Sequence, residues 1–135
     1  MYSKILIPLA LDHEAVSGRA LEAARALQSK GGTLTILTVI EPIPAHVAQY
    51  LPDTQQEKIL NDIKTALRTE FGAFDDITVI AQTGHAAQTI LDIASDGAFD
   101  CVIIASHRPG LQDYFLGSTA GRVVRHAQCA VHVIR

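Results

Sequence analysis

Five short apolar runs, separated by segments with helical spacing, constrain the fold of this chain more than any other feature. The runs are rich in β-branched residues, and their almost continuous hydrophobicity is typical of parallel strands that are buried on both faces. They cover residues 4–11, 33–40, 77–83, 101–106 and 130–134. The segments between them repeat apolar residues at intervals of three and four, which predicts amphipathic helices. These cover residues 14–29, 54–71, 86–96 and 117–127.

The strict alternation of strand and helix predicts one α/β domain over residues 1–135. Strands that are joined by helical crossovers lie parallel, and right-handed crossovers place helices on both faces of the sheet. Apolar residues make up 48% of the 135 residues, which is enough for one core of ordinary size. Gly31 and Gly32 predict the end of the first helix. Ligands of such sheets bind outside the carboxyl ends of the strands, so that edge is where we expect a site.

Charge, hydropathy and cysteine content exclude several classes of partner. A net charge of −3 argues against a protein that binds nucleic acid by neutralising phosphates. The N-terminal apolar stretch is interrupted by Pro8 and is too short to span a bilayer, so we expect neither a membrane anchor nor a cleaved leader there. Cys101 and Cys129 lie in apolar runs, as do free buried thiols in a reducing compartment. We therefore expect a cytoplasmic protein.

The segment ASHRPGLQDYFLGST, residues 105–119, has a composition that indicates ligand binding. Ala105 ends a buried strand with a small side chain, which lets a ligand approach the backbone closely. Gly117, Ser118 and Thr119 open the last predicted helix. Backbone N–H groups at a helix N-terminus are unpaired and the helix dipole favours anions, so this segment has the chemistry of a phosphate site.

His107 and Arg108 follow the strand directly, where they can supply positive charge or a hydrogen bond at the mouth of the segment. An alternative remains open, in which Ser118 only caps the last helix and Pro109-Gly110 is a surface turn. The chain contains neither GxxxxGK[ST] nor a GxGxxG after its first strand. A P-loop and an NAD-type dinucleotide site are therefore excluded.

No group of side chains has the spacing of a catalytic or metal site. The six histidines are scattered without the intervals typical of metal ligands. Asp75-Asp76 and the pair Asp92 and Asp96 lie away from the carboxyl ends of the predicted strands, so they are not placed for acid–base work. No serine lies in a G-x-S-x-G sequence, and neither cysteine has an evident activating base. We expect no catalytic residue and no metal ligand.

Four stretches of the chain resemble the universal stress protein family. KILIPLAL resembles its KILVPVD opening, LTILTVIEP its second strand, TGHAAQTILDIASDGAFDCVIIAS its block of glycine, helix and fourth strand, and GSTAGRVVRHAQCAVHVIR its C-terminal block. The resemblance covers the whole chain. It implies an adenine nucleotide alpha hydrolase-like fold with a five-stranded parallel sheet in the order 3-2-1-4-5. It also implies a homodimer that pairs the last strand, residues 130–135.

The resemblance bears on nucleotide binding as well. Some members of the family bind ATP through G-x2-G-x9-G-[S/T] after the fourth strand, and others lack the motif and bind no nucleotide. Gly117 and Ser118 match the end of this motif, but Ala105 replaces its first glycine, and the segment SHRPGL lacks the second. Ala10 stands where the ATP-binding type has an aspartate that contacts the sugar. Arg108 is placed to take over a phosphate contact from the missing glycine.

We therefore expect a stress-response module that binds ATP or a related adenine nucleotide with little or no hydrolysis. The base would lie near Pro8, Ala10 and Val39, and the phosphates on residues 105–119. Any Mg²⁺ would be carried on the phosphates with water ligands. The alternative is a nucleotide-free member of the family whose dimer surface is its working part, a protein-interaction module.

Overall fold

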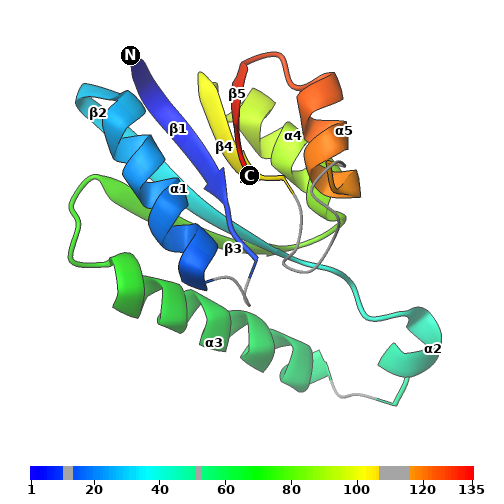
Figure 1. Cartoon of the computed structure of the whole chain (residues 1–135). Helices are drawn as coiled ribbons and strands as arrows, with labels where there is room; N and C mark the ends of the chain where they lie inside the picture. The colour runs from blue at the N-terminus through cyan, green and yellow to red at the C-terminus, as the bar shows by residue number, and fades with distance from the viewer. Residues whose placement is uncertain (11–13, 51–52, 107–115) are drawn as a thin grey trace.

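The structure, a computed structural model, describes residues 1–10, 14–50, 53–106 and 116–135 (Figure 1). Strands and helices alternate along the chain as the apolar runs predict, with one additional short helix after the second strand. The elements are β1 (Tyr2–Pro8), α1 (Glu14–Leu27), β2 (Gln28–Ile40), α2 (Ala45–Ala48), α3 (Asp53–Phe71), β3 (Ile77–Thr83), α4 (Ala86–Asp96), β4 (Cys101–Ala105), α5 (Ser118–His126) and β5 (Ala130–Ile134).

The five strands form one sheet in the order β3-β2-β1-β4-β5, and all neighbouring strands run parallel. This confirms the predicted fold class and strand order. Figure 1 shows α1 and α3 on one face of the sheet and α4 and α5 on the other, with α2 set apart beyond the end of β2. β3 and β5 are the edge strands, so the C-terminal strand has the edge position that its sequence predicts.

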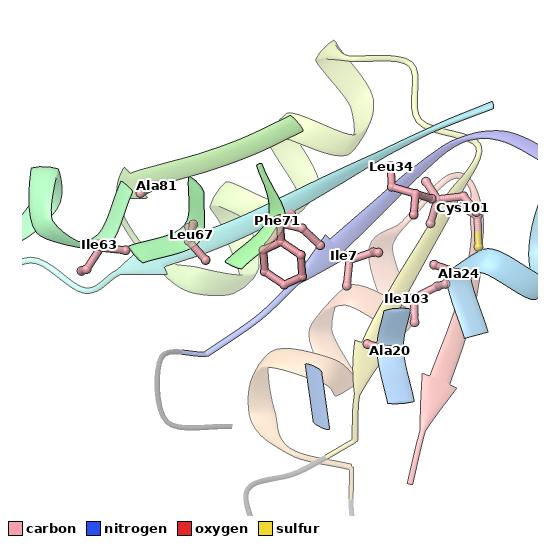
Figure 2. Close-up of a cluster of buried hydrophobic side chains, with 12 residues drawn as sticks. Ile7, Ala20, Ala24, Leu34, Ile63, Leu67, Phe71, Ala81, Cys101 and Ile103 are labelled. Carbon is pink, nitrogen blue, oxygen red and sulfur yellow. The ribbon is translucent and has the colours of Figure 1, made fainter. Parts of the chain in front are cut away.

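Each face of the sheet has its own apolar core, because successive side chains of a strand point to opposite faces. On β1, Ile5 and Ile7 join the cluster under α1 and α3, whereas Leu6 joins the cluster under α4 and α5. All three side chains are fully buried. Figure 2 shows the first of these clusters, in which Phe71 of α3 and side chains of four strands and α1 take part. Burial on both faces explains why the strands are continuous apolar runs.

The start of β2 differs from its predicted position. β2 begins at Gln28, and Gly31 and Gly32 lie within it instead of ending α1. Between the pairs Tyr2↔Gln28 and Lys4↔Thr33, β2 advances five residues while β1 advances two, which is an irregular bulge. Gly31 has φ 78°, a conformation that favours glycine. The two glycines thus serve this bulge, and the predicted helix end was wrong.

A carboxylate joins three elements at the amino edge of the sheet, next to that bulge. Asp76 precedes β3 and accepts two hydrogen bonds from the guanidinium of Arg25 in the last turn of α1, one of them 3.0 Å long. Gln28 Nε2 donates to Asp76 Oδ2 at 2.8 Å and to the Gly32 carbonyl at 2.7 Å. The hydrogen bonds from Arg25 and then Gln28 lower the pKa of Asp76 from 3.8 to about 2. The network fixes α1, β2 and β3 at one end.

This network should make the stability of the protein depend on acid pH through Asp76. Its folded pKa is lowered, so its contribution is complete above about pH 4 and is lost as pH falls towards 2. Asp76→Asn should lower the free energy of unfolding by about 1 kcal/mol at neutral pH, a figure reduced because the side chain is 36% exposed. Urea denaturation at pH 7 and pH 3 measures both effects. The variant should lose less stability than the unaltered protein between these pH values.

Asp75→Asn is the matched control, because Asp75 is the exposed neighbour in the same turn. It should leave the free energy of unfolding within about 0.5 kcal/mol at neutral pH. An equal loss in both variants would show that general charge, and not the bonds from Arg25 and Gln28, stabilises this turn.

Candidate functional site

The carboxyl ends of the two central strands and the start of α5 meet at one edge of the sheet. β1 ends at Pro8, which pairs with Leu37 of β2, and Ala10 follows as an exposed residue. β4 ends at Ala105, which pairs with Ile134 of β5. These are the ends at which sequence and topology both predict a ligand site.

The pairing between β1 and β4 stops well before these ends. Among the described residues it covers Ile5↔Cys101 and Leu6↔Val102. By contrast, the pairing of β1 with β2 continues to the end of β1, and the pairing of β4 with β5 continues to the end of β4. The strand order also reverses between β1 and β4, since β2 and β3 lie to one side and β5 to the other. The carboxyl edge between β1 and β4 is therefore the topological switch point, where ligands of open α/β sheets bind.

The N-terminus of α5 is attached to the end of β4. The Gly117 N–H donates to the Ser106 carbonyl, and the Ser106 N–H donates to the Ile134 carbonyl at 2.8 Å. Gly117 is the N-cap residue and has no side chain with which to cap the helix. The first turn of α5 contains no acidic residue, and the last turn contains Arg125 and His126. Ser118 is exposed, so the first turn of this helix presents N–H groups and hydroxyls suited to an anion.

The N-terminus of α4, at the same edge, is engaged by a carboxylate of the protein itself. Glu41 follows β2, and its Oε1 accepts a hydrogen bond from the Ala86 N–H at 3.1 Å. Its Oε2 lies 3.6 Å from Nδ1 of His85, the N-cap residue of α4. Of these two helix ends, α5 is thus the one without such an internal anion among the described residues.

The end of β1 is held by β2 through a side chain as well as through backbone. The Leu9 N–H donates to the Leu37 carbonyl at 2.8 Å, and the Thr38 hydroxyl donates to the Leu9 carbonyl at 3.0 Å. Thr38 is 2% exposed. Sequence reasoning missed Thr38 and Glu41. The available signals were a hydroxyl near the end of an apolar strand and a carboxylate directly after it.

Most of the residues assigned to the site from sequence lie at this edge. Pro8 ends β1 and Ala10 follows it, Ala105 ends β4, and residues 117–119 are the N-cap and first residues of α5. Val39 lies one strand further out, near the end of β2, where it pairs with Gln82 and packs on the cluster under α4 and α5. The end of β1, the end of β4 and the start of α5 therefore lie at the switch point, and Val39 lies beside it on β2. His107 and Arg108 lie outside the described residues.

A separate open hollow of about 540 Å³ lies at the opposite, amino edge of the sheet. It is lined by residues 28–33 of β2 together with Asp75 and Asp76. The bulge in β2 and the network around Asp76 account for this hollow. It is remote from the switch point, so we do not assign it to the site.

The two thiols are not activated. Burial, followed by the neighbouring Cys129, raises the pKa of Cys101 to about 11. Burial also raises the pKa of Cys129. Both cysteines are free, and neither is a thiolate at neutral pH. Within the described ranges no three His, Cys, Asp or Glu side chains are grouped to hold a metal ion, and no helix there has the length and apolar character to cross a membrane.

The chain matches the model of the "Universal stress protein family" over residues 1–135. It is 27% identical to universal stress protein G of Salmonella typhimurium over the full length of both chains. Its fold is similar to universal stress protein UspA from Lactobacillus plantarum, with a TM-score of 0.77, 24% identity, and 99% and 98% of the two chains covered.

Two further solved structures contain nucleotides. One is a universal stress protein in complex with cAMP, with a TM-score of 0.60, 20% identity, and 99% and 97% of the chains covered. The other is a family protein from Arabidopsis thaliana with AMP bound, with a TM-score of 0.57, 16% identity, and 98% and 90% covered. These likenesses show the shared fold.

Proposed function

The chain belongs to the universal stress protein family, and on that premise we propose that it binds ATP or a related adenine nucleotide at the carboxyl edge between β1 and β4. It would act as a cytoplasmic stress-response module and carry out little or no hydrolysis. A cytoplasmic location agrees with two free thiols.

One observation carries the proposal. The ladder between β1 and β4 ends at Leu6↔Val102 while its neighbours continue, and the start of α5 is tied to the end of β4 beside this point. An open backbone edge and a helix N-terminus thus lie together. The first can receive a flat base and sugar, and the second favours phosphate.

In this proposal the nucleotide lies across the switch point. The base contacts the ends of β1 and β2 at Pro8, Ala10 and Val39, and the phosphates lie against Gly117, Ser118 and Thr119 and the end of β4 at Ala105. The AMP and cAMP complexes of family proteins support the adenine class, because both ligands contain adenine, ribose and one phosphate group. They also suggest that a long phosphate chain is dispensable for binding.

The side chains at this edge support holding a nucleotide more than cleaving one. Phosphoryl transfer needs a metal ion held in place and a group that orients the attacking water. The described residues contain no cluster that could hold a metal, so a divalent ion would be carried on the phosphates with water ligands. Glu41, at the start of α4, accepts the Ala86 N–H and lies 3.6 Å from Nδ1 of His85.

Binding can be measured directly. We expect native mass spectrometry of the purified protein, or isothermal titration with ATP, AMP and cAMP in the presence of Mg²⁺, to show an adenine-nucleotide complex. Released phosphate should stay below about one turnover per minute, far under the median of enzymes. An empty native spectrum together with no heat at about 1 mM nucleotide, a concentration that detects even millimolar affinity, would contradict the proposal.

A second candidate function is a protein-interaction module that works as a homodimer without nucleotide. The observation in its favour is β5, an edge strand with half-buried Val131, Val133 and Ile134 and exposed His132. An apolar edge strand offers unpaired backbone groups to a second chain. Sedimentation should then show a dimer that forms equally well with and without nucleotide, and a monomer at high micromolar concentration would exclude it.

A further inference from the structure

We infer that Thr38 is a positioning residue for the nucleotide, because its hydroxyl holds the peptide of Leu9, directly after β1, against β2. The inference rests on the proposed function, since Pro8 and Ala10 on either side of that peptide are the residues we assign to the base. Thr38 itself lies within β2 and is 2% exposed, so it acts through the position of β1.

The bond lies where the regular pairing of β1 ends. Pro8 is the last residue of β1 that pairs with β2, and its partner is Leu37. At Leu9 the N–H still donates to the Leu37 carbonyl, at 2.8 Å. The Leu9 carbonyl accepts the Thr38 hydroxyl at 3.0 Å, and the next residue, Ala10, is exposed. Both polar backbone groups of Leu9 are thereby bound to β2.

On the other side of β1, the described residues of β4 do not pair with this peptide. The pairing with β4 has stopped at Leu6↔Val102, three residues before Leu9. Among the described residues the end of β1 is therefore bonded to β2 and not to β4, and a side-chain hydroxyl supplies one of these bonds. A strand end that is ordered in advance loses less entropy when a ligand binds, so the bond should appear as affinity.

The competing explanation is that Thr38 is simply a satisfied hydroxyl of the core, with an effect on stability alone. Thr35 provides the matched control. It lies in the same strand, is 6% exposed, and pairs in β2 with Leu6, three residues before Leu9. Thr35→Val removes a buried hydroxyl as Thr38→Val does. It leaves the Leu9 carbonyl bonded.

The experiment measures AMP and ATP affinity by isothermal titration for the full chain and for Thr38→Val, Thr38→Ser and Thr35→Val. We expect Thr38→Val to raise Kd about threefold to tenfold, the effect of one lost hydrogen bond. Thr38→Ser keeps the hydroxyl, and Thr35→Val keeps the bond between Thr38 and the Leu9 carbonyl. The Kd of both variants should therefore stay within about twofold of that of the unaltered protein. Amide exchange followed by NMR should be faster at Leu9 in Thr38→Val alone.

The outcomes separate the two claims. If the unaltered protein binds nucleotide and Thr38→Val binds equally well, the positioning role is overturned and the proposed function stands. If Thr35→Val weakens binding as much as Thr38→Val, the effect follows stability, and the role is again overturned. Failure of the unaltered protein to bind overturns the proposed function and this inference with it. Should Thr38→Val not fold, Thr38→Cys, a weaker donor of similar size, should raise Kd in the same direction.

Discussion

Replacement of Gly117 by aspartate should weaken adenine-nucleotide binding about a hundredfold or more and leave the fold intact. The φ of Gly117 is −57°, which any residue can adopt, and aspartate is a favoured N-cap residue. Its carboxylate would accept hydrogen bonds from the first N–H groups of α5 and repel a phosphate there. Affinity and stability should thus change in opposite directions. Titration with ATP measures the first, and thermal unfolding without nucleotide measures the second.

Gly117→Asn is the control for charge. Asparagine caps a helix about as well as aspartate, but it is neutral, so its effect on affinity should be clearly smaller. If Gly117→Asp retains full affinity, the phosphates do not lie at the start of α5. If both variants lose affinity equally, occupation of the N–H groups matters and charge repulsion does not.

The largest expected effect on stability is at Ile103, in the centre of β4. Its side chain is fully buried in the cluster that β1, β4 and α1 share, and Figure 2 shows it among Ile7, Ala20 and Ala24. Ile103→Ala should lower the free energy of unfolding by about 3 to 4 kcal/mol, because transfer free energy is lost and a cavity remains. This is a large share of the total stability of a domain of ordinary size. Urea denaturation gives the difference.

Two further variants calibrate that result. Ile103→Val removes one methyl group and should cost about 1 kcal/mol. Ile59→Ala truncates a side chain on α3 that is 42% exposed and should cost less than about 1 kcal/mol. A loss at Ile103 no greater than the loss at Ile59 would mean that the cluster under α1 and α3 is not a packed core.

The strands could be predicted from the sequence because of their burial. Residues such as Ile5, Leu6 and Ile7 serve two cores at once, so the run remains apolar at every position. The start of β2 could not be predicted in the same way. Gly31 and Gly32 have the local signature of a helix end, and only the pairing of Gln28 and Thr33 with β1 on either side of them, with the bond from Gln28 to the Gly32 carbonyl, places them in a strand.

The residues of the candidate site differ in the same way, because some have a local sequence signal and others depend on contacts with distant segments. Gly117 and Ser118 are recognisable because a helix start has a local composition. Thr38 and Glu41 act on partners 29 and 45 residues away in the sequence, so their roles depend on which strand ends become neighbours. A threonine in an apolar strand gives no sign of the carbonyl that it will meet. The strand order given by the resemblance brings the segments together without specifying these contacts.

The contact of Glu41 with the first turn of α4 has a consequence for stoichiometry. Its carboxylate occupies that helix end, and an external anion would have to displace it from the Ala86 N–H. Of the helix starts of α4 and α5, the described residues thus leave the one at α5 for an external anion. Titrations should accordingly saturate at one nucleotide per chain, and free inorganic anions should compete with the nucleotide for that same position.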